Sequence, residues 1–201
     1  MRFAAHAALA TACFLLPATA RAGAQQYEPL ADSVRASMSA AMSDRAPSVL
    51  LFERAEDAHR WVFEMSRRLT KRVPDRANRM AFLKTVHYEA SRAGLDPQLV
   101  LGVIEVESGF RKYAVSSAGA RGFMQVMPFW TGVLERPRDN LFHLRTNLRY
   151  GCLILRHYLD IEKGDFFRAL GRYNGSLGKA EYPNLVLGAW HGRWKYDGPI
   201  R

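Results

Sequence analysis

The stretch Asp96–Pro128, DPQLVLGVIEVESGFRKYAVSSAGARGFMQVMP, decides the fold of the chain around it. Its first half carries the signals of both ends of a helix. Asp96 can accept hydrogen bonds from first-turn N–H groups, and Pro97 suits the first helical position. Gly109 can adopt the left-handed conformation that ends a helix. These signals predict a helix over residues 97–108.

Glu107 carries the chemical interest of this helix. It lies three residues after Ile104 and four after Val103, so it shares their apolar stripe, whereas Glu105 points away. Burial and the negative end of the helix dipole both raise the pKa of a carboxyl group placed there. Glu107 is then a proton donor near neutral pH, or a core glutamate paired with an arginine. Helix geometry alone leaves both interpretations open.

The second half of the stretch is a loop of small residues that lets backbone approach a ligand closely. Its small residues are Gly109, Ser116, Ser117, Ala118, Gly119 and Gly122. The loop leads to Met124 and Gln125 and ends at Pro128. Between Glu107 and Gln125 it contains no Asp or Glu. That absence disfavours an ordinary glycosidase, which places two carboxylates around the bond that it cuts.

Three short motifs follow one another along the chain. They are Glu107-Ser108, then the segment Gly122–Pro128 (GFMQVMP), and then Arg172-Tyr173-Asn174. Together they resemble the SLT domain of the soluble lytic transglycosylases, a lysozyme-like family that cuts peptidoglycan. The resemblance covers about residues 84–190. Phe123 stands where the family has Leu. Arg172 stands where it has Ala, which adds charge at the expected cleft rim.

The resemblance implies an all-α fold, a lysozyme-like helical domain of the SLT or goose type with an active-site cleft, preceded by an N-terminal helical extension. It implies that Glu107 is the catalytic residue and that Tyr173 hydrogen-bonds its carboxyl group. It places substrate contacts at Ser108, Ser116, Met124, Gln125, Tyr173 and Asn174. Met124 and Tyr173 also fit a role in the core, and Gln125 and Asn174 also fit a role in a turn.

The reaction that the resemblance implies is cleavage of the β-1,4 bond between N-acetylmuramic acid and N-acetylglucosamine. Glu107 would act first as acid and then as base, and the product would carry 1,6-anhydro-N-acetylmuramic acid. Two alternatives remain. A lysozyme-type hydrolase would need a second carboxylate from farther along the chain, at Asp139, Asp160, Asp165 or Glu181. A non-catalytic wall-binding protein would keep the fold alone.

The first residues indicate export. Arg2 precedes an apolar run, and small residues suit signal peptidase cleavage after Ala20, Ala22 or Ala24. We therefore predict a signal peptide over residues 1–22, a helical extension over 23–80 and the SLT domain over 81–201. The expected location is the periplasm or cell envelope. Cleavage would leave Cys152, which fits a small buried residue within an apolar helical pattern.

The composition narrows the classes of molecule that the protein is expected to bind. The 201-residue chain has a formal net charge of +10, which suits an anionic cell-wall polymer. The leader argues against nucleic acid. The histidines show no metal-ligand spacing, and His87 lies on an apolar face as a core residue would. We expect peptidoglycan glycan strands as partner, no metal and no cofactor, with peripheral association with envelope or secretion machinery left open.

Helical periodicity accounts for most of the remaining chain. It predicts helices over residues 31–42, 53–71, 75–94, 128–134, 147–161, 166–173 and 181–187 in addition to 97–108. Alternating polar and apolar residues are confined to short runs, with strand pairs expected only within residues 110–115.

Overall fold

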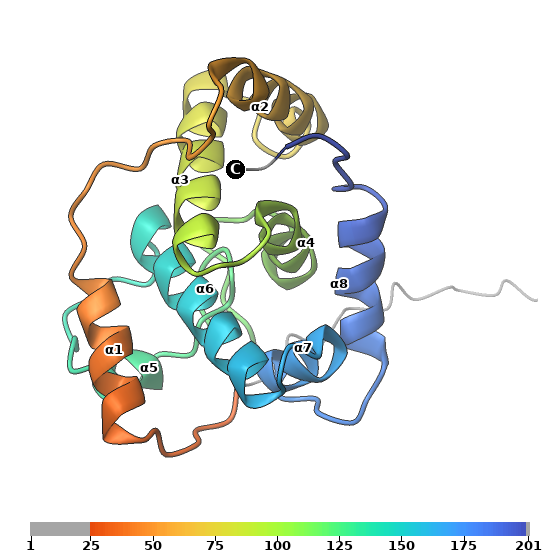
Figure 1. Ribbon diagram of the computed structural model, residues 1–201. Coiled ribbons are helices and arrows are strands. Elements are labelled where there is room, and N and C mark those ends of the chain that lie inside the picture. Colours follow the sequence, from red (N-terminus) through yellow and green to blue (C-terminus); the bar gives the residue numbers. More distant parts are fainter. Residues whose placement is uncertain (1–24, 200–201) are drawn as a thin grey trace, which may run out of the picture.

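The computed structural model describes residues 25–199 (Figure 1), so the predicted signal peptide lies outside the described residues. The described part folds into eight helices. They are α1 (Asp32–Met42), α2 (Ala55–Leu69), α3 (Arg76–Arg92), α4 (Pro97–Ser108), α5 (Phe129–Val133), α6 (Leu144–Ile161), α7 (Phe166–Asn174) and α8 (Glu181–His191). Val115, Arg121 and Val126 form isolated β-bridges in the loop after α4. The predicted all-α fold is confirmed.

The predicted ends of α4 are confirmed in detail. The Asp96 side chain accepts a hydrogen bond from the Gln98 N–H at 2.7 Å, and Pro97 occupies the first turn. Gly109 has φ 57°, the left-handed conformation that lets the chain leave the helix. Local hydrogen bonding therefore fixes both ends of the helix that carries Glu107.

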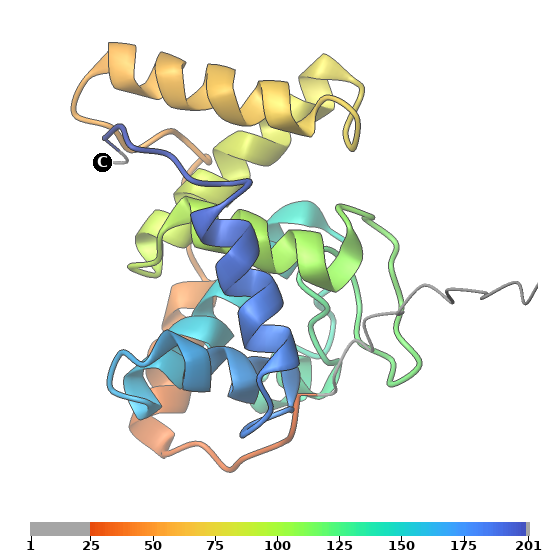
Figure 2. The same cartoon turned by 90° about the vertical axis from the view of Figure 1, so that its right-hand side faces the viewer.

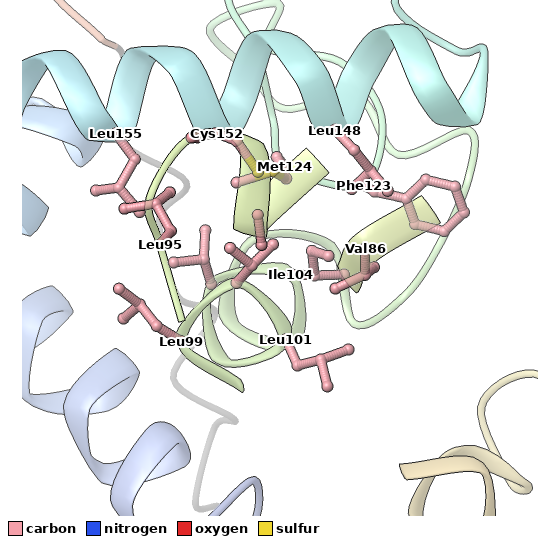
Figure 3. Packing of buried hydrophobic residues seen from close by; sticks show 14 of the residues in the cluster. Val86, Leu95, Leu99, Leu101, Ile104, Phe123, Met124, Leu148, Cys152 and Leu155 are labelled. Atoms are coloured by element: carbon pink, nitrogen blue, oxygen red, sulfur yellow. The ribbon is translucent and has the colours of Figure 1, made fainter. Parts of the chain in front are cut away.

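Helix α4 lies at the centre of the molecule, with α3, α6, α7 and α8 around it (Figure 1). The side chains from Leu99 to Ile104 are fully buried. Figure 3 shows Ile104 on the side of α4 that faces α6, near Val86 of α3, with Leu148 of α6 above them. Burial of this apolar surface is the main favourable term that holds α4 in place.

Helix α8 runs antiparallel to α4 and close against it. Near one end, the Trp190 indole N–H donates to Asp96 at 3.0 Å. In the middle, a Cβ on Gly102 would lie 3.3 Å from the Val186 carbonyl oxygen, so glycine permits the close approach. The approach brings the start of α8, at Tyr182, to the last turn of α4. Helix α8 ends at His191, one turn beyond the predicted residue 187.

The N-terminal helices share a core with the rest of the described chain. Met38 and Met42 of α1 and Trp61 of α2 belong to the same buried cluster as α4. Arg149 of α6 donates to the backbone carbonyl oxygen of Met42 at 2.9 Å. The predicted boundary between residues 80 and 81 falls inside α3, so the extension and the predicted domain are packed as one structure.

Candidate active site

Glu107 lies in the last turn of α4, partly exposed, with its carboxyl group against the start of α8. The Tyr182 hydroxyl donates a hydrogen bond to Glu107 Oε1 at 2.6 Å. Burial raises the pKa of Glu107 to about 8, against the opposing effect of the Tyr182 hydrogen bond, which lowers it. Among the described residues no arginine or lysine pairs with Glu107. The raised pKa favours the protonated form of the carboxyl group near neutral pH, and no ion pair among the described residues favours the charged form.

The predicted hydrogen bond between Tyr173 and Glu107 is wrong. The Tyr173 hydroxyl is buried and donates to the Met124 carbonyl oxygen at 2.8 Å. Tyr182 takes the place beside Glu107 because α8 packs antiparallel to α4. Tyr182 was not among the residues predicted for the site. The Tyr173 hydroxyl instead ties α7 to the loop that follows α4.

Glu105, the neighbouring carboxylate on α4, has a separate structural task. It accepts hydrogen bonds from Arg72 at 3.3 Å, from Arg193 at 3.0 Å and from the Trp194 indole at 2.8 Å. Two of these three partners, Arg72 and Arg193, form ion pairs with it. The helix therefore carries one carboxylate in ion pairs and, two residues later, one carboxyl group without them.

Asn147 at the start of α6 fixes the loop that follows α4. It is fully buried, and its Oδ1 accepts from the Met124 N–H at 2.8 Å. Its Nδ2 donates to the carbonyl oxygens of Arg121 at 2.8 Å and Leu141 at 2.9 Å. Gly122 has φ 75°, and a Cβ there would lie 2.5 Å from the Asn147 amide. The predicted motif Gly122–Pro128 thus depends on a residue that the sequence did not single out for the site.

Met124 and Gln125 are interior residues. Met124 is fully buried and packs against Gly151, where a Cβ would lie 2.3 Å from its sulfur. The Gln125 amide nitrogen donates to the carbonyl oxygens of Ala114 at 3.1 Å and Gly122 at 2.9 Å. Gln125 also has φ 48°, a strained conformation for a residue other than glycine. Both side chains shape the loop, and the predicted direct contact of Met124 with sugar is corrected to a position in the core.

The remaining predicted contacts differ in exposure. Ser108 is buried and its hydroxyl donates to the Ile104 carbonyl oxygen at 3.1 Å, so it too is internal. Ser116 is partly exposed, and its hydroxyl accepts from the Ala120 N–H at 3.1 Å within a tight turn. Asn174 is buried at the end of α7, and its amide nitrogen has no hydrogen-bond partner among the described residues. Of these three, Asn174 keeps an unused donor.

Arg172 does not supply the rim charge expected from its place in the third motif. It pairs with Glu162, and its Nη1 lies 2.8 Å from Glu28. Both partners are carboxylates, so the guanidinium charge is neutralised locally. The substitution for the family's Ala therefore links α7 to the N-terminal segment.

Other titratable residues have structural environments. The His87 ring is buried, stacks on Phe52 with 4.5 Å between centroids, and accepts from the Leu51 N–H at 3.3 Å. Cys152 is buried, and burial raises the pKa of its thiol. Within residues 25–199 no group of three His, Cys, Asp or Glu side chains is placed to hold a metal ion. The same residues include no helix that is both long and apolar enough to span a membrane.

Residues 84–183 match the family model described as "Transglycosylase SLT domain". The chain is 34% identical over 111 residues to "Membrane-bound lytic murein transglycosylase C" of Glaesserella parasuis serovar 5, a match that covers 51% of this chain and 30% of the relative. It is 33% identical over 124 residues to "Transglycosylase" of Enterobacteria phage PRD1, covering 58% of this chain and 46% of the relative.

A third relative, "Membrane-bound lytic murein transglycosylase C" of Actinobacillus pleuropneumoniae serotype 5b, is 51% identical over 51 residues. That match covers 25% of this chain and 14% of the relative. The chain therefore spans less than half the length of these relatives. No solved structure gives a significant match.

Proposed function

Because residues 84–183 form a domain of the transglycosylase SLT family, we propose that the protein is a peptidoglycan lytic transglycosylase. It cleaves the β-1,4 bond between N-acetylmuramic acid and N-acetylglucosamine and leaves a 1,6-anhydro end. The single observation that carries this proposal is the geometry around Glu107. Its carboxyl group, at the end of α4, accepts a hydrogen bond from Tyr182 at 2.6 Å, and among the described residues it forms no ion pair.

The first step of the proposed reaction uses that proton. Glu107 donates it to the glycosidic oxygen, and the bond from this oxygen to C1 of N-acetylmuramic acid breaks. A general acid works best when its pKa lies near the operating pH, and a pKa of about 8 meets that condition. The Tyr182 hydroxyl holds the carboxyl group in place through this step and then stabilises the carboxylate that forms.

The second step returns the proton. The Glu107 carboxylate takes the proton of the C6 hydroxyl of the same N-acetylmuramic acid, and O6 forms a bond to C1. Glu107 ends protonated, so one turnover consumes no water. The attacking hydroxyl already belongs to the ring, and this proximity removes much of the entropic cost of attack.

The positions of the other carboxylates support this route over hydrolysis. Asp139 is bound by Arg136 and by the Tyr150 hydroxyl. Asp160 pairs with Arg156, and Asp165 caps the start of α7. Those three carboxylates therefore have other partners. Of the four that the hydrolase alternative named, only Glu181 is exposed and adjacent to the site, as the neighbour of Tyr182.

The supporting residues fall into two groups in this proposal. Asn174 has a buried amide nitrogen without a partner among the described residues, and its side chain turns toward a hydroxyl or acetamido oxygen of the glycan when the strand binds. Ser116 contacts the glycan from the partly exposed turn of the loop. The buried residues Ser108, Met124, Gln125 and Tyr173 act indirectly by holding the loop and the end of α4. Residues 1–22 serve as a signal peptide, and the protein works at the cell envelope, as the names of its relatives indicate for them.

Product analysis tests the function. Purified peptidoglycan is digested in H₂¹⁸O, and the muropeptides are analysed by mass spectrometry. The expected products carry 1,6-anhydro ends, lighter by one water than hydrolysis products and free of ¹⁸O. Glu107→Gln should abolish them, and Glu181→Gln should leave them. Labelled reducing ends that disappear in Glu181→Gln would show a hydrolase with Glu181 as second carboxylate.

A further inference from the structure

The loop after α4, which begins two residues after Glu107, carries exposed cations and an exposed aromatic ring that lies against Phe142. Lys112 Nζ lies 5.1 Å from the centroid of the Tyr113 ring, and that ring lies 5.8 Å from Phe142. The Arg121 guanidinium lies 6.0 Å from the Phe142 centroid. Two cations, Lys112 and Arg121, therefore flank the pair of rings formed by Tyr113 and Phe142. We call these residues, together with Arg111, the loop platform.

The loop platform faces solvent. Tyr113 is 70% exposed, although large aromatic side chains are usually covered. Figure 2 shows the loop projecting from the end of α4 at the side of the molecule. Residues 111–115 line a surface hollow. A projecting row of rings and cations beside a hollow is a surface suited to a ligand with both apolar faces and negative charge.

The charge of the loop platform is not balanced by carboxylates. In the described part of the chain, none of Arg111, Lys112 and Arg121 forms an ion pair. Arginines of the core behave differently, since Arg145 and Arg149 both pair with buried Glu89, at 3.0 and 2.8 Å. Three cations without carboxylate partners make a positive field over the exposed face of the loop.

The loop platform is anchored at both ends, which limits how far its charges can move. Arg111 is tied to the last turn of α4, because its Nε donates to the Ser108 carbonyl oxygen at 2.9 Å. Arg121 forms β-bridges to Val115 and Val126, and its carbonyl oxygen accepts from Asn147. Charges on a fixed frame bind an anion at a lower entropic cost than charges on a mobile loop.

Building on the proposed function, we propose that the loop platform binds the carboxylates of the peptide stems, so that the enzyme prefers glycan strands that still carry peptides. Peptide stems are attached to N-acetylmuramic acid, the sugar on which Glu107 acts in that function. Their carboxylates can pair with Arg111, Lys112 and Arg121, and a sugar ring can lie on Tyr113. Denuded glycan strands lack these anions and lose the ionic contacts.

The test compares two substrates: intact peptidoglycan strands and the same strands stripped of peptides by an amidase. For the wild type we expect a higher kcat/KM on peptide-bearing strands, through KM more than kcat, and a preference that weakens as salt rises. The triple variant Arg111→Ala, Lys112→Ala, Arg121→Ala should lose about tenfold in kcat/KM on peptide-bearing strands, as expected for three exposed charge contacts. It should change little on denuded strands.

The matched control removes exposed cations elsewhere. Arg45 lies between α1 and α2, and Lys163 lies between α6 and α7. The variant Arg45→Ala, Lys163→Ala should keep the wild-type preference. Equal loss on both substrates in the triple variant, or an equal rate of the wild type on both, overturns the inference. Either outcome leaves the proposed function standing if the products carry anhydro ends, whereas absence of turnover on both substrates contradicts the function itself.

Discussion

The Tyr182 hydroxyl lies 2.6 Å from Glu107 Oε1, although the two residues are 75 positions apart in the chain. The contact arises because α8 packs antiparallel to α4 over Gly102, which puts the start of one helix beside the end of the other. Burial raises the pKa of Glu107 and the hydrogen bond moderates that rise. Helix packing thus determines both the position and the protonation state of the carboxyl group.

Replacing Tyr182 by Phe should alter the pH dependence of activity. The hydrogen bond from Tyr182 lowers the pKa of Glu107, so its loss should raise that pKa further. Activity that needs protonated Glu107 falls as pH rises through its pKa, and this alkaline limb should move to higher pH. The value of kcat should also fall, by about tenfold, because the carboxyl group loses its orientation.

Tyr173→Phe is the matched control for that measurement. It removes a buried hydroxyl that bonds the Met124 carbonyl oxygen and not Glu107. It should lower stability, since the carbonyl group loses its partner, while the alkaline limb stays in place. A shift in Tyr173→Phe with none in Tyr182→Phe would restore the assignment made from the sequence.

Glu107→Gln should stabilise the protein at alkaline pH. The pKa of Glu107 is about 8 in the folded chain, against the ordinary value of 4.5. Between these values the folded state holds a proton that the unfolded state has lost, so this group's contribution to stability falls as pH rises from 4.5 to 8. Glutamine does not titrate. The melting temperature of the variant should therefore exceed that of the wild type at pH 9.

The same pair of proteins at pH 4 provides the control. There Glu107 is protonated in the folded state and largely protonated in the unfolded state, so the two melting temperatures should nearly coincide. An equal gain at both pH values would mean that the glutamine improves packing and that titration is not the cause.

Asn147→Ala should destabilise the loop and the site together. The Asn147 side chain serves three backbone groups: those of Met124 and Leu141, which are buried, and that of Arg121, which is partly buried. Each buried group left without a partner costs about 1–3 kcal/mol, so a loss of about 3 kcal/mol or more in the free energy of unfolding is expected. Urea unfolding measures it. Asn184→Ala, at an exposed position of α8, should change little.

The sequence predicted what local chemistry controls. The ends of α4 at Asp96 and Gly109 follow from capping, and the direction of Glu107 follows from its spacing to Ile104. Contacts between residues far apart in the sequence could not be predicted in this way. Tyr173 belongs to the third motif and Tyr182 follows it by nine residues. Only the packing of α8 on α4 decides which of the two tyrosines reaches Glu107.

Burial of the motif residues could not be read from their spacing either. Gln125 is a polar residue in a glycine-rich loop, which favours exposure, yet its amide bonds two carbonyl groups of the same loop. Asn147 looked like an ordinary position near the start of a helix. Its role in holding the loop depends on the close approach of the Gly122 turn, which the sequence pattern does not show.

Gly102→Val should reduce activity by separating the two helices that form the site. A Cβ at residue 102 would lie 3.3 Å from the Val186 carbonyl oxygen and 3.4 Å from the Trp190 nitrogen, both backbone atoms of α8. A branched side chain cannot fit there without moving α8, and overpacking of this kind costs about 1–3 kcal/mol. The displacement should weaken the Tyr182–Glu107 hydrogen bond, so kcat should fall at temperatures where the variant is fully folded.

Gly188→Ala, in α8, is the control substitution for Gly102→Val in α4. A Cβ on Gly188 meets nothing within 4 Å, so alanine adds no clash. Replacing a helical glycine by alanine restricts the unfolded chain and should raise stability by about 0.5–1 kcal/mol. Circular dichroism melts and rate assays on both variants separate the effects. If Gly102→Val folds, melts at a lower temperature and yet keeps the wild-type kcat and alkaline limb, then close contact between α4 and α8 does not set the geometry of Glu107.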